Sequence, residues 1–309
     1  MKTFYDASSQ VVSWVQSNKI ELQKTGGQIK HLYYPETLFE LKTLVERLNQ
    51  EKKTYDIIGY SSNTLFLPSY TIENLICTKK TNNWYETENE IICECGVNVS
   101  VLSKVMVQKG YVGFEGLTDL PGTIAAGVYG NAGCRHCSVN ELLNSFSLLT
   151  PLNEVKTLTV EDLNLEYRSS SLKRKELKGV ILEVRLKKIK GNADELLQIA
   201  KKNHEVRLMQ QPSPANNLGT TFIGHKLSRK GLILKKSEKI LQKIIRSNDT
   251  RKSFPLLLRL IGKGAFSPYV YYWNRYMFLD EKSHNIFPKY CTFIQSLYLD
   301  ARLEIEVRK

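Results

Sequence analysis

The residues of this chain with the clearest chemical meaning are the small ones between positions 113 and 133. In the run from Gly122 to Gly133, seven of the twelve residues are glycine or alanine. Glycine has no Cβ, so such a backbone can lie against a flat ring or turn its N–H groups to a diphosphate. Each glycine costs a helix up to about 1 kcal/mol, and glycines pack poorly in a sheet. The run therefore predicts an irregular wall of a nucleotide or flavin site; the alternative is a glycine-rich surface loop.

Cysteine spacing raises a second chemistry, metal binding. Cys134 and Cys137 form a lone CxxC, and Cys93 with Cys95 has the wrong spacing to complete a zinc site. We therefore expect no metal and interpret the CxxC as a turn that contains thiols. The chain shows no secretory signal and no apolar run long enough to span a bilayer, so we expect a cytoplasmic protein with reduced cysteines.

Positive charge is concentrated in residues 226–263, which hold 12 Lys or Arg against two acids in a chain of net charge +13. Such a block predicts an anionic neighbour: a nucleotide substrate, nucleic acid or acidic lipid. Apolar residues within 234–245 share one helical face surrounded by lysines, a pattern typical of peripheral membrane contact. No nucleic-acid-binding module accompanies the charge, so we expect no nucleic-acid partner. A solvated basic face packed on its own domain remains an alternative.

The elements that must position these residues are a mixture of helices and strands. Apolar periodicity predicts helices over 36–50, 98–109, 195–208 and 234–245. Strands are predicted over 54–59, 73–80, 90–97, 142–149 and 179–187, with a helix-to-strand passage over 287–307. This mixture predicts an α+β fold, and the length of 309 residues predicts two or three domains.

Four passages follow one another along the chain: Ile58-Gly59-Tyr60-Ser61-Ser62-Asn63-Thr64-Leu65, residues 115–133 with Pro121-Gly122-Thr123 and Asn131-Ala132-Gly133, Glu166-Tyr167-Arg168-Ser169-Ser170-Ser171-Leu172, and Arg207 with Gln211-Pro212 and Gly219-Thr220-Thr221-Phe222. In this order they resemble the bacterial UDP-N-acetylenolpyruvoylglucosamine reductases, which are FAD enzymes. The terminal Leu303-Glu304-Ile305-Glu306-Val307 is a weaker match. The second passage is the most specific.

The resemblance implies a two-part FAD-binding region of the vanillyl-alcohol oxidase (PCMH) type, followed by a smaller, divergent α+β substrate domain. We expect the two FAD-binding subdomains over 1–80 and 81–205 and the substrate domain over 206–309. Two departures stand out. Gly59-Tyr60-Ser61 stands at the family's Gly-x-Gly turn, and Ile223-Gly224-His225 replaces the family's Lys-Asn-Pro.

The same resemblance implies non-covalent FAD, NADPH as reductant, and hydride transfer through the flavin to the enolpyruvyl group of a nucleotide sugar, giving a lactyl ether. Two segments and one arginine are expected to bind the cofactor: Gly59, Tyr60, Ser61, Ser62, Asn63 and Thr64; Pro121, Gly122, Thr123, Ala126, Gly127, Asn131, Ala132 and Gly133; and Arg168.

Catalytic roles carry over to three positions. Arg168 would hold the substrate carboxylate through its planar donors, with Glu306 assisting it. Thr220 stands at the family's serine and would deliver the proton to the α-carbon. Ordinary interpretations remain open: a surface salt bridge for Arg168, an exposed terminal strand for Glu306, and a turn for Thr220.

The diverged C-terminal part leaves the substrate open. A paralogue could act on another enolpyruvyl nucleotide sugar in surface glycan synthesis. The alternative function, from another class, is a degenerate flavin-binding scaffold in a membrane-associated glycan assembly complex, touching the membrane through residues 226–263.

Overall fold

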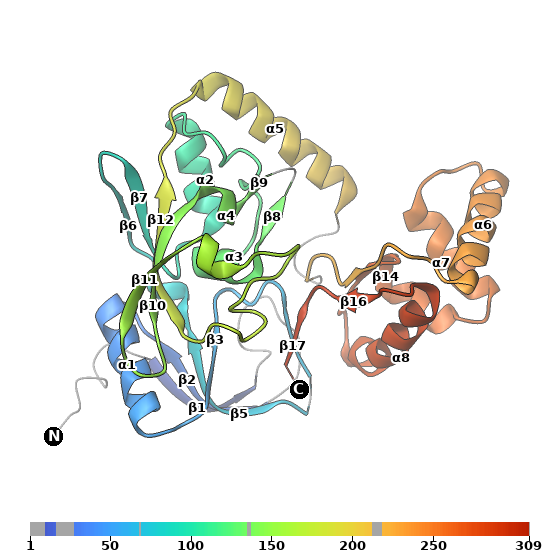
Figure 1. Cartoon of the computed structure of the whole chain (residues 1–309). Coiled ribbons are helices and arrows are strands. Elements are labelled where there is room, and N and C mark those ends of the chain that lie inside the picture. The colour runs from blue at the N-terminus through green and yellow to red at the C-terminus, as the bar shows by residue number, and fades with distance from the viewer. Residues whose placement is uncertain (1–9, 17–27, 68, 135–136, 212–217, 309) are drawn as a thin grey trace. The chain divides into compact units, whose positions relative to one another are not determined.

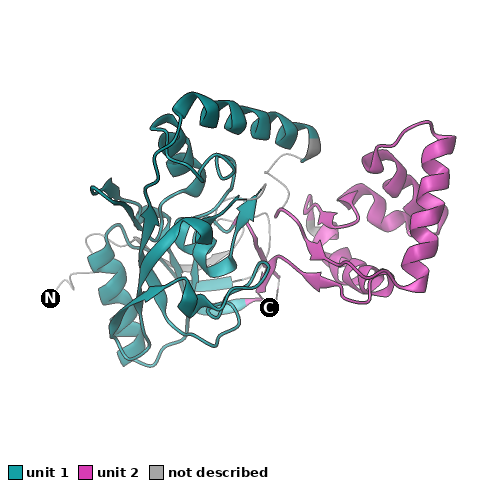
Figure 2. Cartoon of the chain, turned by 45° about the horizontal axis from the view of Figure 1, so that its top comes forward, with its two compact units in different colours: residues 1–15, 28–61, 71–211 teal, residues 16–27, 62–70, 212–309 magenta. Residues whose placement is uncertain are grey.

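A computed structural model describes residues 10–16, 28–67, 69–134, 137–211 and 218–308 of the chain (Figure 1). The chain divides into two compact units (Figure 2). Unit 1 comprises residues 1–15, 28–61 and 71–211, and unit 2 comprises residues 16–27, 62–70 and 212–309. A short segment from the N-terminal half, residues 62–70, therefore belongs with the C-terminal unit.

The first layer of unit 1 is a four-stranded sheet in the order β1-β2-β5-β3. Its strands are β1 (Gln10–Gln16), β2 (Gln28–Tyr34), β5 (Thr71–Cys77) and β3 (Tyr55–Ile58). β5 runs parallel to both β2 and β3. The crossover between β2 and β3 is α1 (Leu38–Gln50), which begins where the Thr37 side chain accepts a hydrogen bond from the Glu40 N–H at 3.1 Å.

The second layer is a five-stranded antiparallel sheet in the order β11-β10-β12-β7-β6. Its strands are β11 (Val155–Thr159), β10 (Leu143–Leu149), β12 (Val180–Lys187), β7 (Glu90–Glu94) and β6 (Trp84–Glu86). The helices of this part are α2 (Val99–Gln108), α3 (Ile124–Gly130), α4 (Val139–Leu142) and α5 (Ala193–Gln210), and α5 packs on α2 (Figure 1). Their buried apolar faces form one core with the sheet.

Unit 2 is built around an aromatic core, to which Phe222, Phe266, Tyr276, Phe287 and Tyr290 contribute. Its helices are α6 (Arg229–Ile244), α7 (Thr250–Leu260) and α8 (Glu281–Leu297). Its strands form three pairs: β4 (Thr64–Phe66) with β17 (Glu306–Arg308), β13 (Phe222–Ile223) with β16 (Arg302–Leu303), and β14 (Val270–Tyr272) with β15 (Arg275–Tyr276).

Smaller elements complete the described chain: β8 (Gly133–Cys134) and β9 (Cys137–Ser138) in unit 1, and the 3-10 turns Thr78–Lys80, Glu161–Leu163 and Gly264–Tyr269. The predicted helices and strands of unit 1 are confirmed within a few residues, and the predicted basic helix begins earlier, at Arg229. The apolar run after Pro255 lies within α7.

One prediction about the glycine-rich run is wrong. Residues 124–130 form α3, although glycine disfavours helices. The helix is short and begins at an N-cap, where Thr123 Oγ1 accepts from the Ala126 N–H at 3.3 Å. Ile124 and Val128 are buried, and a Cβ at Gly127 would lie 2.8 Å from Val139 Cγ2. Close packing that only glycine allows, together with burial of the apolar face, offsets the propensity cost.

Candidate functional site

The turn after β3 lies against the start of α3. A Cβ at Gly59 would come within 2.6 Å of both Cγ2 and Oγ1 of Thr123, far inside van der Waals contact. Gly59 is therefore needed for this approach, and a larger residue would push the turn away from Thr123. The structure thus brings together the first residue of one sequence motif and the helix cap of the other.

The turn itself presents backbone donors. Within the described residues, the N–H groups of Tyr60, Ser62 and Asn63 find no acceptor. Ser61 is buried and takes a left-handed conformation, with φ +48°, at the place of the family's second glycine. Successive N–H groups around a left-handed residue form a concave site that binds anions such as a diphosphate. A non-glycine residue in this conformation carries a strain of about 1 kcal/mol.

Within unit 2, Asn63 and Thr64 contact the C-terminal strand. β17 pairs in parallel with β4, and the Glu306 N–H donates to the Asn63 carbonyl at 2.8 Å. Asn63 Nδ2 donates to the Glu304 carbonyl at 3.3 Å. The predicted cofactor turn and the predicted catalytic Glu306 are therefore neighbours, and Glu306 is half-buried rather than fully exposed.

The end of α3 forms a second compact turn. Asn131 caps the helix with φ +47°, Nδ2 donates to the Glu166 carbonyl at 2.8 Å, and Oδ1 accepts from Asn140 Nδ2 at 3.1 Å. A Cβ at Gly133 would lie 2.4 Å from the Cys137 carbonyl oxygen, so the β8–β9 hairpin also requires glycine there. These contacts tie the end of α3 to the segments around Glu166 and Asn140.

Arg168 lies on this turn. Its guanidinium donates to the carbonyls of Asn131 at 3.2 Å and Gly133 at 2.6 Å, and lies 5.2 Å from the centroid of the Tyr167 ring. Its own backbone is left-handed, with φ +56°. The structure therefore brings Arg168 to residues 131–133 of the predicted cofactor wall, and the two carbonyls fix the orientation of the guanidinium.

The remaining wall residues differ in exposure. Gly122, with φ +121°, and Thr123 and Gly127 are buried, Ala132 is half-buried, and Pro121 and Ala126 are exposed. The α3 N-terminus also hydrogen-bonds to its own unit, because the Ile124 and Ala125 N–H groups donate to the Val97 and Cys95 carbonyls. Within the described residues, the N–H groups of Tyr60, Ser62 and Asn63 therefore remain available to a ligand.

Thr220 and Thr221 have opposite environments in unit 2. Thr221 is fully buried, and Oγ1 accepts from the Tyr276 N–H at 3.0 Å, so it is structural. Thr220 is half-buried, and its hydroxyl has no partner within the described residues. It follows Gly219, whose φ is +83°. Of the two hydroxyls, only that of Thr220 is available to a substrate.

The thiols show no metal-binding arrangement. The described residues contain no group of three or more His, Cys, Asp or Glu that could hold a metal ion. Cys134 and Cys137 face each other across the β8–β9 hairpin, and both are free thiols. Burial raises the pKa of Cys137 above its usual value, with Glu115 adding to the effect, and raises the pKa of both Cys93 and Cys95 to about 12. Thiols shifted in this direction stay protonated and react poorly.

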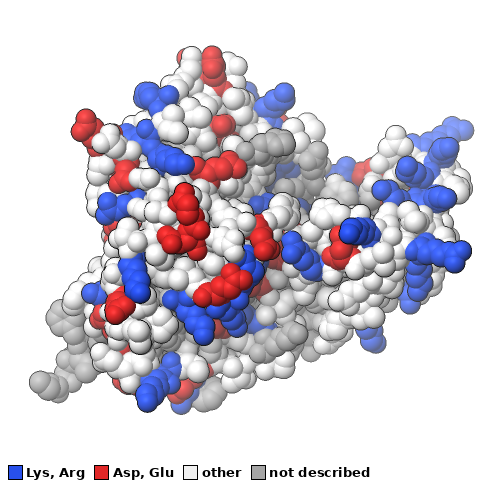
Figure 3. All heavy atoms as spheres, viewed as in Figure 1, with Lys and Arg blue, Asp and Glu red and all other residues white. Residues whose placement is uncertain are grey.

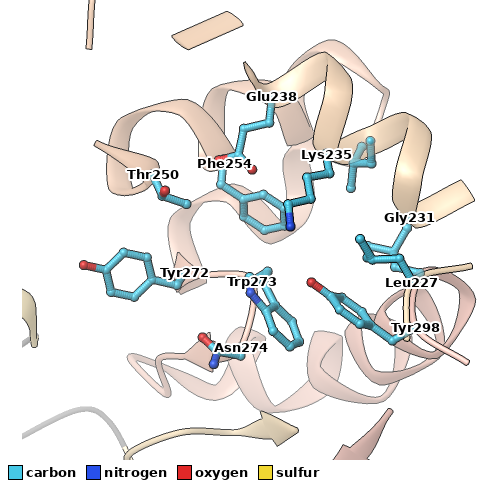
Figure 4. A pocket seen from close by; sticks show the side chains of 12 residues that line it. Leu227, Gly231, Lys235, Glu238, Thr250, Phe254, Tyr272, Trp273, Asn274 and Tyr298 are labelled. Atoms are coloured by element: carbon cyan, nitrogen blue, oxygen red, sulfur yellow. The ribbon is translucent and has the colours of Figure 1, made fainter. Parts of the chain in front are cut away.

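Unit 2 also contains an open pocket of about 300 Å³, which sequence reasoning missed because its walls come from separate elements. Lys235 on α6, Trp273 in the β14–β15 turn and Tyr298 after α8 point into it (Figure 4). Trp273 and Tyr298 stack with centroids 4.2 Å apart, and burial raises the pKa of Tyr298 to about 12, which keeps its hydroxyl a donor. Glu238 also lines this space, and burial raises the pKa of its carboxyl group, which disfavours its negative charge there. The ammonium, the indole N–H and the phenol therefore leave donors that suit an anionic group.

No family model matches the chain. The UDP-N-acetylenolpyruvoylglucosamine reductase of Streptococcus pneumoniae strain JJA is 28% identical over 205 residues, covering 65% of this chain and 67% of that protein. The enzyme of the same name from strain TIGR4 is also 28% identical over 205 residues, covering 64% of its own length. The crystal structure of UDP-N-acetylenolpyruvylglucosamine reductase from Thermus caldophilus covers 97% of this chain with a TM-score of 0.71 at 20% identity.

This chain is similar in sequence to the UDP-N-acetylenolpyruvoylglucosamine reductases of Streptococcus pneumoniae and shares its fold with the enzyme from Thermus caldophilus. The predicted α+β fold with a larger region followed by a smaller domain is confirmed. Sequence similarity covers about two thirds of the chain, whereas fold similarity covers nearly all of it.

The residues present fit FAD. The N–H groups of Tyr60, Ser62 and Asn63 could hold its diphosphate. Nothing in this arrangement requires a covalent link.

Proposed function

We propose that this chain is an FAD-dependent reductase that uses NADPH to reduce the enolpyruvyl group of a nucleotide sugar to a lactyl ether. The observation that carries the proposal is the turn at residues 59–63, where the N–H groups of Tyr60, Ser62 and Asn63 have no acceptor within the described residues, in a chain similar to the reductases of that reaction. The substrate would be UDP-N-acetylenolpyruvoylglucosamine or the corresponding sugar of a surface-glycan route.

Arg168 would act on the substrate carboxylate. In this reaction class the bound flavin, once reduced by NADPH, supplies hydride to the β-carbon of the enol ether, and negative charge collects on the adjacent carboxylate. Stabilising that charge requires donors fixed in place beforehand. The two carbonyls that accept from Arg168 keep its planar guanidinium in one orientation, which supports this role.

Thr220 would deliver the proton that completes the reduction at the α-carbon. Its hydroxyl is unpartnered within the described residues, whereas that of Thr221 is committed to Tyr276. A threonine hydroxyl can replace the family's serine chemically, although its β-methyl adds bulk and restricts χ1. Glu306, half-buried on β17 beside Asn63, would assist by hydrogen bonding.

We also propose that the pocket of unit 2 contributes to substrate recognition. Lys235, Trp273 and Tyr298 would donate to a phosphate or carboxylate of the nucleotide sugar. This assignment accounts for a substrate domain that lacks the family's usual residues after Phe222. Replacing Lys235 by alanine should then raise KM for the nucleotide sugar and leave the rate of flavin reduction by NADPH unchanged.

The deciding experiment follows the two half-reactions separately by stopped-flow absorbance. Purified protein should carry FAD that acid releases, NADPH should bleach it, and UDP-N-acetylenolpyruvoylglucosamine should restore its colour. If NADPH bleaches the flavin and this sugar nucleotide does not restore its colour, the protein is still a flavin reductase, but UDP-N-acetylenolpyruvoylglucosamine is not its substrate. A protein that binds no FAD would overturn the proposal.

A second candidate is a flavin-binding scaffold without turnover, located at a membrane. It is favoured by one observation, the exposed apolar and basic face of α6. The same measurement separates the two, because a scaffold would bind FAD yet show neither half-reaction. In both cases we propose a cytoplasmic location, and none of the described helices is long and apolar enough to cross a bilayer.

A further inference from the structure

Helix α6 packs one face against its own unit. Ser228 caps it by accepting from the Gly231 N–H at 3.1 Å, and Leu241 is buried. A Cβ at Gly231 would lie 2.1 Å from the Leu297 carbonyl oxygen, so the helix rests on the end of α8 at a distance only glycine permits. The face of α6 that carries Gly231 and Leu241 is therefore buried against the rest of unit 2.

The opposite face carries an apolar stripe. Ile233, Ile240 and Ile244 are 61%, 60% and 70% exposed. Residues seven and four positions apart lie on the same side of a helix, so the three isoleucines form one row. Single exposed apolar residues are ordinary, but a row of three isoleucines on one helix is a candidate contact surface.

The charges around this row are all positive. Arg229, Lys230, Lys236, Lys239 and Lys243 are exposed, and Lys236 and Lys243 have the same seven-residue spacing as Ile233 and Ile240. Figure 3 shows Lys and Arg gathered over the outer edge of unit 2, around α6. We call the three isoleucines and these five cations the outer face of α6.

The one acid of α6 is turned away from this face. Glu238 lies along the pocket wall, where its Oε1 accepts from Ser253 Oγ at 2.7 Å, and burial raises its pKa. The sequence shows a helix with one acid among its bases, whereas the structure shows an outer face with none. That separation makes the face complementary to a negatively charged apolar surface.

We propose that the outer face of α6 binds the surface of an anionic lipid bilayer, with the helix lying in the plane of the interface. Isoleucine side chains would enter the boundary between headgroups and acyl chains, and the cations would contact lipid phosphates. Nucleic acid is the weaker fit, because binding it without base readout uses aromatic stacking and the face has no aromatic residue. The inference does not depend on the reductase reaction.

Sedimentation of the full chain with vesicles tests this. Vesicles of phosphatidylcholine alone are compared with vesicles of equal parts phosphatidylcholine and phosphatidylglycerol. We expect binding to the anionic vesicles only. Because each lysine near such a surface contributes about 1 kcal/mol, the pair K236E and K243E should weaken binding more than about tenfold. The pair I233S and I240S should weaken it by on the order of tenfold, since two buried side chains are lost.

Helix α5 supplies the matched control. Ile199 is 46% exposed, and Lys201 and Lys202 are exposed, but α5 mixes acids and bases. The changes I199S and K201E/K202E should leave binding within about twofold of the parent. Circular dichroism and retained FAD would show that every variant is folded.

Four results would overturn the proposal. Equal binding to neutral and anionic vesicles would show that charge does not drive binding. Unchanged binding by both pairs of α6 variants would show that the outer face of α6 is not the binding surface. An effect of the lysine pair without one of the isoleucine pair would mean electrostatic adsorption only. If vesicles fail to bind and a single-stranded RNA binds instead, the partner is nucleic acid.

Discussion

Gly59 faces Thr123 so closely that a side chain at position 59 would overlap Thr123 Cγ2 and Oγ1, each 2.6 Å from the expected Cβ. The pair joins the turn after β3 to the cap of α3. Both residues belong to motifs that the sequence singles out, yet they are distant along the chain, and their contact fixes the spacing of the proposed cofactor cradle.

Replacing Gly59 by alanine should therefore damage FAD binding and lower the free energy of unfolding by about 1–3 kcal/mol, the usual cost of overpacking. Gly130, at the end of α3, is the matched control, because nothing lies within 4 Å of a Cβ there. Gly130→Ala should keep FAD and be neutral or slightly stabilising. FAD titration and thermal unfolding of both variants measure this; equal FAD affinity would contradict it.

Changing Arg168 to lysine keeps a charge but loses the planar fork. We expect flavin reduction by NADPH to stay near the parent rate, while the second half-reaction loses about 2–4 kcal/mol of transition-state stabilisation. The guanidinium also bonds to the Asn131 and Gly133 carbonyls, so FAD affinity must be measured in parallel. A variant that loses FAD and keeps the second half-reaction per bound flavin would make Arg168 a structural residue only.

The adjacent threonines should separate chemistry from stability. Thr220→Ala should abolish or greatly slow protonation of the α-carbon at unchanged melting temperature, and Thr220→Ser should restore it. Thr221→Val should leave a buried Tyr276 N–H unpaired and lower stability by about 1–3 kcal/mol. Turnover with substrate and thermal unfolding distinguish the two effects. Normal turnover by Thr220→Ala would exclude its hydroxyl as the proton donor.

Glu306→Gln should have a smaller effect than either change, because it keeps the size and the backbone pairing of β17 with β4. We expect slower reoxidation of the flavin by substrate and an unchanged melting temperature. Stopped-flow traces at saturating substrate measure this. A change in FAD affinity without a change in reoxidation would instead assign Glu306 to support of the turn at Asn63.

Asp300 should make unit 2 sensitive to acid. Its carboxylate accepts from the Lys226 N–H at 2.8 Å and the His225 N–H at 2.9 Å, and these bonds hold its pKa below the usual value of an aspartate. Its contribution is therefore present above that value and is lost as the pH falls through the lowered pKa. Asp300→Asn should flatten the loss of melting temperature below about pH 4, whereas Asp194→Asn on α5 should not. Equal profiles would show that the bonds add no stability.

Most helices and strands of unit 1 can be predicted from the sequence, because they follow from residue patterns that extend over only a few positions. Apolar periodicity locates α1, α2, β7, β10 and β12 within a few residues. The Gly59 and Pro121–Gly133 motifs mark the proposed cradle, because a glycine in the sequence indicates a position where a Cβ would not fit. The helix within the glycine-rich run was not predicted, since its stability comes from packing on Val139 rather than from propensity.

The sequence by itself determined the α+β class, the likeness to the reductases and the positions worth testing. Only the tertiary structure decided that β17 brings Glu306 to Asn63, that Thr220 rather than Thr221 has an available hydroxyl, and that Glu238 leaves the outer face of α6 wholly basic. The reason is physical. Backbone requirements and periodicity act over a few residues, whereas burial and hydrogen-bond partners depend on which distant segments pack together.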